Sequence, residues 1–114
     1  MIASPPTVPN CVTQVAAPHQ LMLACADGNF WLSGITWRHW GKAEATGTAT
    51  AHANDCNPYC AAGHFHTYPV TVTIGSLRAC SGRREYTRLV IRYTTRPRSG
   101  VRNPETVDLG CRAR

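Results

Sequence analysis

Apolar and polar residues alternate along several short stretches of this chain, and each stretch predicts a β-strand. A period of two places successive side chains on opposite faces of a strand, whereas a helix repeats every 3.6 residues. No stretch shows a convincing helical period. The alternating segments are 19–25, 30–37, 44–53, 68–74 and 86–94.

Two of these segments indicate how the core is built. Small residues alternate with threonines over 44–53, and threonine suits the exposed face of a strand. The small face should therefore lie inward against bulky side chains. Segment 30–37 carries bulk on both faces, with Trp31, Ile35 and Trp37 sharing one face under strict alternation. Three tryptophans within ten residues are typical of a sugar-stacking platform or of a core, and we expect Trp31, Trp37 and Trp40 in the core.

Turn signals between the segments predict one all-β domain. Asp27-Gly28-Asn29 and Ser81-Gly82 are strong examples. We expect a small disulfide-stabilised β-sandwich or barrel of about five to seven strands. Residues 1–18 contain four prolines and predict an extended N-terminal arm, and residues 19–114 predict a single β-domain.

The stretch 54–70 concentrates the candidate chemistry. Pro58 fixes its own φ and pushes the preceding residue toward extended geometry, so the segment must turn. A turn of that size brings Cys56 and Cys60 within reach of a disulfide. Asn54 and Asp55 are residue types that bond nearby backbone N–H groups in turns, and Gly63 permits a positive φ.

The same stretch also has a metal-binding interpretation. Cys56, Cys60, His64 and His66 form the pattern C-x3-C-x3-H-x-H, which is tighter than the usual zinc-finger spacing. We favour the disulfide, because an even number of cysteines in a short chain indicates an oxidising compartment. Zinc is the alternative, and we otherwise expect no cofactor.

Aromatic side chains on this loop lead to the main functional hypothesis. A disulfide-held loop presents contact area at little ordering cost. We expect a secreted, non-catalytic binding domain, and the alternative is a secreted protease inhibitor that uses the same loop. The expected binding residues are Tyr59, His64, Phe65, His66 and Tyr68.

Other features bear on location. No stretch reaches the length of about 20 apolar residues that spans a membrane. The N-terminus lacks the basic and apolar regions of an export signal, so an exported chain of this sequence would be a mature form with an added methionine. We therefore expect an extracellular protein without a membrane span.

Charge is placed unevenly along the chain. Residues 1–77 sum to −1, whereas residues 78–114 carry ten arginines against three carboxylates and sum to +7. A basic half can bind an anionic polymer, nucleic acid or an acidic protein face, or it can simply be a solvated surface. We expect an extracellular protein or an anionic cell-surface polymer as partner, rather than nucleic acid. The predicted basic patch is Arg88, Arg92, Arg96 and Arg98.

Catalysis finds little support in the residues. The chain has no glycine-rich phosphate loop, nucleophile elbow or zinc-protease motif. A disulfide would disarm the thiols of Cys56 and Cys60 as nucleophiles. We therefore do not expect an enzyme.

Several short motifs support a family resemblance. Residues 21–94 resemble a family of small exported proteins of uncharacterised function from high-GC Gram-positive bacteria. This resemblance implies export and a cysteine-supported β-fold, and it transfers no activity to any residue. The motifs are residues 25–29 (CADGN), 37–41 (WRHWG), 45–48 (ATGT), 54–63 (NDCNPYCAAG), 68–72 (YPVTV) and 86–89 (YTRL).

The resemblance leaves Cys11 and Cys111 outside its bounds. Their positions at the two ends suggest that they bridge each other, which would leave Cys25 to pair with Cys80. Six cysteines allow 15 pairings, so this connectivity is a hypothesis.

Overall fold

The computed structural model describes residues 4–98 and 100–111, and their regular structure is almost entirely β. Eight strands form two antiparallel sheets, one with the order β1-β2 and one with the order β3-β4-β5-β6-β7-β8. No helix in these residues is long and apolar enough to cross a membrane. The strands are β1 (Val8–Asn10), β2 (Thr13–Val15), β3 (Leu21–Met22), β4 (Phe30–Arg38), β5 (Ala45–Asn54), β6 (Phe65–Cys80), β7 (Arg83–Tyr93) and β8 (Glu105–Asp108).

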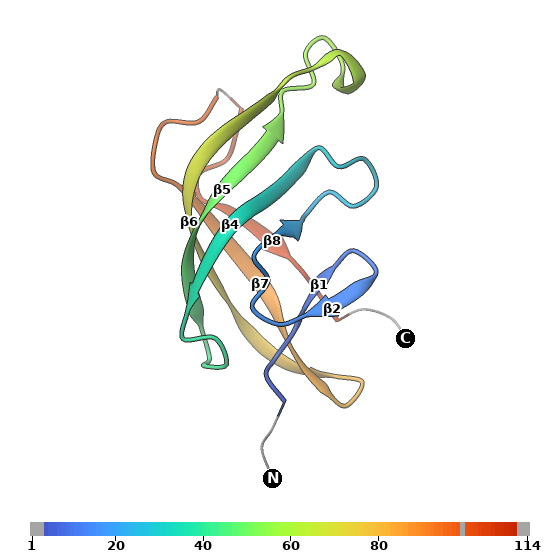
Figure 1. Cartoon of the computed structure of the whole chain (residues 1–114), viewed down its shortest axis with the longest axis vertical. Coiled ribbons are helices and arrows are strands. Elements are labelled where there is room, and N and C mark those ends of the chain that lie inside the picture. The colour runs from blue at the N-terminus through green and yellow to red at the C-terminus, as the bar shows by residue number, and fades with distance from the viewer. Residues whose placement is uncertain (1–3, 99, 112–114) are drawn as a thin grey trace.

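The six-stranded sheet curves around the hydrophobic core, and the β1–β2 hairpin lies on the side toward which it curves (Figure 1). The inward residues of β4 to β7 are buried, among them Leu32, Val72 and Leu89. Val8 of β1 is also fully buried and joins the same cluster. The predicted disulfide-stabilised all-β domain is confirmed, with eight strands instead of five to seven.

A β-bulge in β4 changes which residues of that strand face inward. The pairing with β5 shifts between Ser33 and Thr36, and Gly34 has a φ of +59°. As a result Leu32 and Ile35 are both buried although they are three residues apart. The strict alternation predicted for 30–37 is therefore wrong beyond Ser33, because a bulge inserts an extra residue into one strand.

Two of the three tryptophans tie the N-terminal segment to the sheet. The Trp37 indole N–H donates to the Pro18 carbonyl, and that of Trp40 donates to the Pro6 carbonyl, each at 2.9 Å. Both rings pack against the core, as predicted. Trp31 instead lies on the opposite face of the sheet, so its prediction as a core residue is wrong.

The N-terminal segment is not simply an extended arm. Its described part contains the β1–β2 hairpin, and Thr7 pairs with Glu85 of β7 as an isolated parallel bridge. The hairpin strands have only three residues each, and one contains a proline. They are therefore too short to show a periodic pattern in the sequence.

Two further strands differ from the sequence prediction. Strand β6 runs from Phe65 to Cys80 and is much longer than the predicted segment 68–74. Strand β8 pairs with β7 through only four residues, Glu105–Asp108, and had no strand signal. Short edge strands lack the repeated alternation on which such predictions depend.

The disulfides join Cys56 to Cys60 as predicted, but the other two pairs differ from the prediction. Cys11 is bonded to Cys25, and Cys80 is bonded to Cys111. The predicted pairs Cys11–Cys111 and Cys25–Cys80 are therefore wrong. The hairpin turn that carries Cys11 lies beside the segment that follows β3, whereas the chain after β8 returns to the end of β6.

Candidate functional site

The turn between β5 and β6 forms one end of the molecule. We name residues 55–64 the tip loop. Figure 1 shows it at one end of the long axis, with the β6–β7 turn near the other end. The molecule extends 52 Å along this axis. The tip loop therefore projects beyond the core on the paired ends of two long strands.

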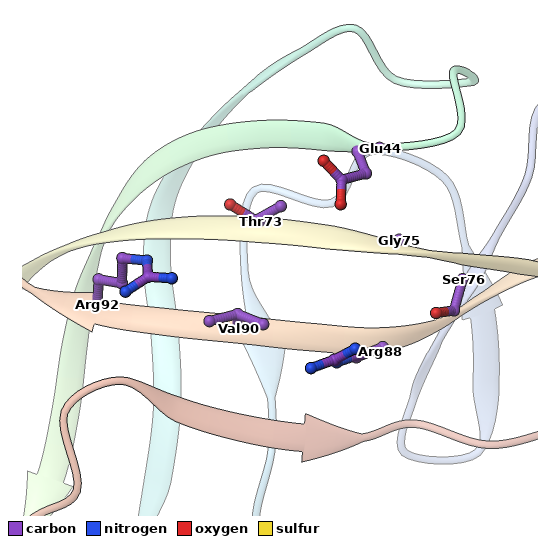
Figure 2. A pocket seen from close by; sticks show the side chains of 7 residues that line it. All are labelled: Glu44, Thr73, Gly75, Ser76, Arg88, Val90 and Arg92. Carbon is purple, nitrogen blue, oxygen red and sulfur yellow. The ribbon is translucent and has the colours of Figure 1, made fainter.

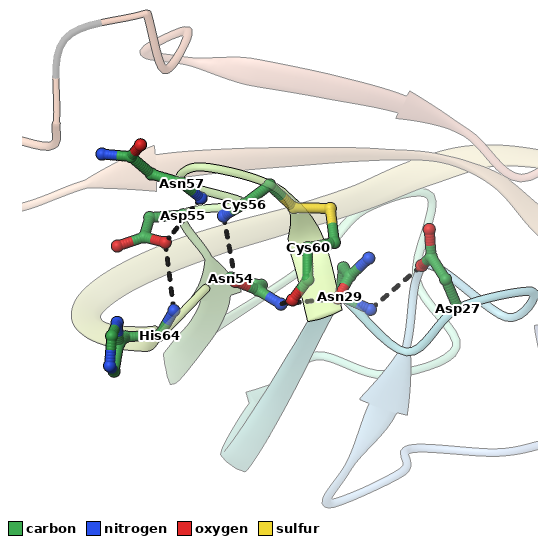
Figure 3. Close-up of a disulfide and its surroundings, with 8 residues drawn as sticks. All are labelled: Asp27, Asn29, Asn54, Asp55, Cys56, Asn57, Cys60 and His64. Carbon is green, nitrogen blue, oxygen red and sulfur yellow. Dashed lines mark hydrogen bonds between the residues drawn. A yellow bond between two sulfur atoms is a disulfide. The ribbon is translucent and has the colours of Figure 1, made fainter. Parts of the chain in front are cut away.

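Asn54 and Asp55 hold the tip loop through their side chains (Figure 3). Asn54 Oδ1 accepts from the Cys56 N–H at 2.9 Å, and Asp55 Oδ1 accepts from the Asn57 N–H at 3.1 Å. These are two successive Asx turns. Asp55 Oδ1 also accepts from the His64 N–H at 3.0 Å, which joins the two ends of the loop.

The amide group of Asn54 extends this network to the neighbouring turn. Its Nδ2 group donates to Asn29 Oδ1 at 2.9 Å and to the Cys60 carbonyl at 2.8 Å. Asn29 in turn donates its backbone N–H to Asp27 Oδ1 at 3.0 Å. The β3–β4 turn therefore supports the tip loop from the side (Figure 3).

The disulfide and a close-packed glycine complete the tip loop. Cys56 and Cys60 are bonded with their Cα atoms 3.6 Å apart. Gly63 has a φ of −78°, so the turn does not use the positive φ that glycine permits. Its lack of a side chain matters for another reason. A Cβ atom there would lie 2.2 Å from Asn54 Oδ1 and 2.7 Å from the Cys56 nitrogen.

Four of the five predicted binding residues lie on this loop or at the start of β6, which follows it. Tyr59 is 63% exposed and Phe65 is 50% exposed. His64 is also exposed, and the His66 Nε2 atom lies 2.9 Å from Asp55 Oδ2. Tyr68 is separate from this group.

Tyr68 belongs to the core side of the sheet and not to the tip loop. It is half-buried and packs edge-on against Tyr93, with ring centroids 5.4 Å apart. Burial, with Glu105 nearby, raises the pKa of Tyr93 to about 12. The pair therefore has the character of a packing contact.

The carboxylate of Asp55 should remain ionised well below the pH at which an ordinary aspartate is protonated. The hydrogen bond with His66, followed by that from the His64 N–H, lowers the pKa of Asp55 far below its usual value of 3.8. Its contribution to stability is therefore fully present above pH about 4 and is lost as the pH falls through the lowered folded pKa. An NMR titration of the Asp55 carboxyl carbon and the His64 amide should show a common midpoint well below the ordinary value. A midpoint near 4 would contradict the network.

The alternative zinc site is wrong. Cys56 and Cys60 are bonded to each other, so neither is a thiolate ligand. Within the residues that the structure describes, no three His, Cys, Asp or Glu side chains are placed to hold a metal ion.

The predicted basic patch is divided between two places. Arg88 and Arg92 project from β7 on the side of the six-stranded sheet away from the core, the outer face, whereas Arg96 and Arg98 lie in the segment after β7. Two of the ten arginines of the basic half, Arg112 and Arg114, lie outside the described residues. Arg38 of β4 shares the outer face with Arg88 and Arg92, which its sequence position did not indicate.

A cluster of Trp31, His52 and Ser33 lies on the outer face at the end nearest the tip loop, and it was not predicted from the sequence. The rings of Trp31 and His52 stack at 3.8 Å, and His52 Nε2 lies 2.7 Å from the Ser33 hydroxyl. A serine hydrogen-bonded to a histidine could act as a nucleophile with its general base, but such a site also needs a third group that orients the histidine. In the described part of the chain, no hydrogen bond or ion pair joins His52 to a carboxylate. Trp31 and His52 are direct partners in adjacent strands, and this register has no signal in the sequence.

No family model, curated protein or solved structure matches this chain.

Proposed function

We propose that this chain is a non-catalytic binding domain of an exported protein and that it contacts an extracellular protein through the tip loop. Three disulfides support an oxidising compartment.

One observation carries the proposal: two large aromatic side chains are exposed on and beside a loop whose backbone is fixed. Tyr59 is 63% exposed inside the ring that the Cys56–Cys60 disulfide closes, and Phe65 is 50% exposed at the start of β6, where the His64 N–H bonds back to Asp55. Aromatic anchors dominate the energetics of protein interfaces. A fixed loop also loses little conformational entropy on binding, so more of the contact energy appears as affinity.

The shape of the loop favours a general binding surface over a protease inhibitor. Residues Cys60–Ala62 form a 3₁₀ turn, with the Gly63 N–H donating to the Cys60 carbonyl. A pseudo-substrate needs an extended segment that can lie along a protease cleft, and the compact turn does not offer one over these residues.

The proposal predicts that partner binding depends on the two exposed rings. Tyr59→Ala combined with Phe65→Ala should weaken binding at least about ten-fold, because truncating interface anchors commonly costs 1.4 kcal/mol or more. The measurement is quantitative mass spectrometry of secreted proteins retained by the immobilised domain, followed by a dissociation constant for the retained partner.

Val12→Ala provides a matched control. Val12 is 98% exposed, but it lies in the turn between β1 and β2, away from the tip loop. The control should retain the partner in full. Equal retention by the double variant, with an unchanged unfolding midpoint, would contradict the proposal.

A further inference from the structure

A second surface, independent of the tip loop, crosses the six-stranded sheet on the side away from the core. This is the outer face. Its residues alternate with the buried ones, and the strand register aligns them in rows from β4 to β7. One row is Thr36, Thr48, Thr71 and Arg92, and the next is Arg38, Thr46, Thr73 and Val90.

Two hollows meet on this face. One has a volume of about 360 Å³, and Figure 2 shows Arg88 and Arg92 along β7 with Val90 between them. The other has a volume of about 580 Å³ and reaches Arg38 on β4. Both are lined by Thr73, so together they form one shallow trough across four strands.

The arginines of this trough are not neutralised by the protein. Arg38, Arg88 and Arg92 are all exposed. Throughout residues 4–98 and 100–111, none of the three forms an ion pair, and the only ion pair joins His66 to Asp55. Two carboxylates are nearby: Glu44 lines the same hollow as Arg88 and Arg92, and Asp108 is the cross-strand partner of Arg88, but neither forms an ion pair with these arginines.

The sheet sets the spacing of these charges. Arg88 and Arg92 are four residues apart on one strand, or about 13 Å. Arg38 lies three strands from β7, or about 14 Å across the sheet. The positive charge is therefore spread in a triangle, with threonine hydroxyls between its corners.

We propose that the outer face binds an anionic polysaccharide, with its acidic groups on the three arginines and its sugar hydroxyls on the threonine rows. The arginine fork matches carboxylate and phosphate geometry with two parallel hydrogen bonds. Threonine hydroxyls both donate and accept, as sugar hydroxyls do. This surface is separate from the tip loop, so the inference goes beyond the proposed function.

Two other classes of partner fit the face less well. Proteins that bind single-stranded nucleic acid place aromatic rings among the basic groups so that bases can stack. On this face Trp31 and His52 already stack on each other at one end. A protein partner would need several exposed apolar anchors. Among the described residues, the exposed Val12 and Tyr59 lie in turns, and Phe65, at the first position of β6, is on this side of the sheet but does not line either hollow.

The test compares single-stranded DNA with three dextrans that share one backbone. Binding to carboxymethyl-dextran, phosphorylated dextran, neutral dextran and single-stranded DNA is measured by calorimetry at low ionic strength. We expect binding to at least one acidic dextran, no binding to neutral dextran, and weaker binding to DNA. The preferred acidic dextran identifies carboxylate or phosphate as the recognised group. No binding to either acidic dextran, or tighter binding to DNA, would overturn the proposal.

Matched variants locate the binding surface. Arg38→Gln with Arg92→Gln should raise the dissociation constant about ten-fold, because two exposed charge-assisted contacts are lost. The control, Arg96→Gln with Arg98→Gln, removes the same charge outside the trough and should change it less than about two-fold. Equal losses in both pairs would mean that binding follows net charge alone, and would overturn the proposal.

Hydroxyl and tip-loop variants complete the test. Thr48→Val with Thr71→Val keeps side-chain shape and strand preference but removes two hydroxyls from one row. It should weaken binding to the acidic dextran about three-fold and leave DNA binding unchanged. Tyr59→Ala with Phe65→Ala should leave polymer binding unchanged, so failure of the tip-loop proposal is distinguished from failure of this one. An unfolding midpoint equal to that of the wild type confirms that each variant is folded.

Discussion

Replacing Cys80 and Cys111 together by serine should lower the free energy of unfolding by about 4 kcal/mol. This disulfide spans 31 residues of sequence, the longest of the three, and long loops lose the most entropy when they are closed in the unfolded chain. Cys80 is buried at the end of β6, and Cys111 follows β8. The expected result is a lower urea midpoint with a steeper slope, because the unfolded chain without this crosslink is less compact and exposes more surface.

The matched comparison is Cys56→Ser with Cys60→Ser. That disulfide spans only four residues, so its removal should cost about 2 kcal/mol or less. Similar losses in the two double variants would show that ring size does not govern the effect. The native state of a domain is commonly 5–15 kcal/mol more stable than its unfolded chain, so both variants should remain folded at 25 °C.

The difference between these disulfides also shows where sequence analysis succeeded. Cys56 and Cys60 could be paired from sequence, because the turn between them forces their approach. The other pairs depend on where the chain ends fall in three dimensions. Cys111 reaches Cys80 only because β8 pairs with β7, and that strand has four residues and no periodic signal. Local chemistry therefore predicted the short ring, and topology determined the long ones.

For the strands, too, local features could be predicted from the sequence and features that depend on the fold could not. The alternation over 44–53 predicted both faces of β5, because a regular strand has a fixed period. The bulge in β4 had only one local signal, Gly34, which takes a φ of +59°. The rows of the outer face could not be predicted either, because they depend on register. Nothing in the sequence places Arg38 two strands from Thr73, whereas the pairings through Thr46 do so directly.

The tip loop was predicted by composition but not in its detail. Cysteines, Asx residues and proline indicated a turn, and exposed Tyr59 and Phe65 lie where that prediction placed binding residues. Tyr68 was assigned to the loop because it is near in sequence. It lies instead on the inward side of β6, since the strand already begins at Phe65.

Substituting Gly63 by alanine should release the tip loop and lower the free energy of unfolding by about 2 kcal/mol. The reason is close approach rather than backbone handedness, because φ at Gly63 is −78°. The new Cβ would lie 2.2 Å from Asn54 Oδ1 and 2.8 Å from Asp55 Oδ1. Those oxygens accept the hydrogen bonds that form the two Asx turns, so the substitution displaces both. Hydrogen exchange at the Cys56 and His64 amides should become faster.

Gly28→Ala is the control that separates a steric clash in the tip loop from the backbone cost of replacing a glycine with positive φ. Gly28 has a φ of +70° and open space around its Cβ position, so alanine there should cost about 1 kcal/mol through backbone conformation alone. Exchange at the tip loop should then stay slow. Gly63→Ala also tests whether binding needs a stiff loop, because it leaves Tyr59 and Phe65 in place. If stiffness supplies the affinity, this variant should lose the partner almost as fully as Tyr59→Ala with Phe65→Ala. Full binding despite fast exchange would instead assign the affinity to the two rings alone.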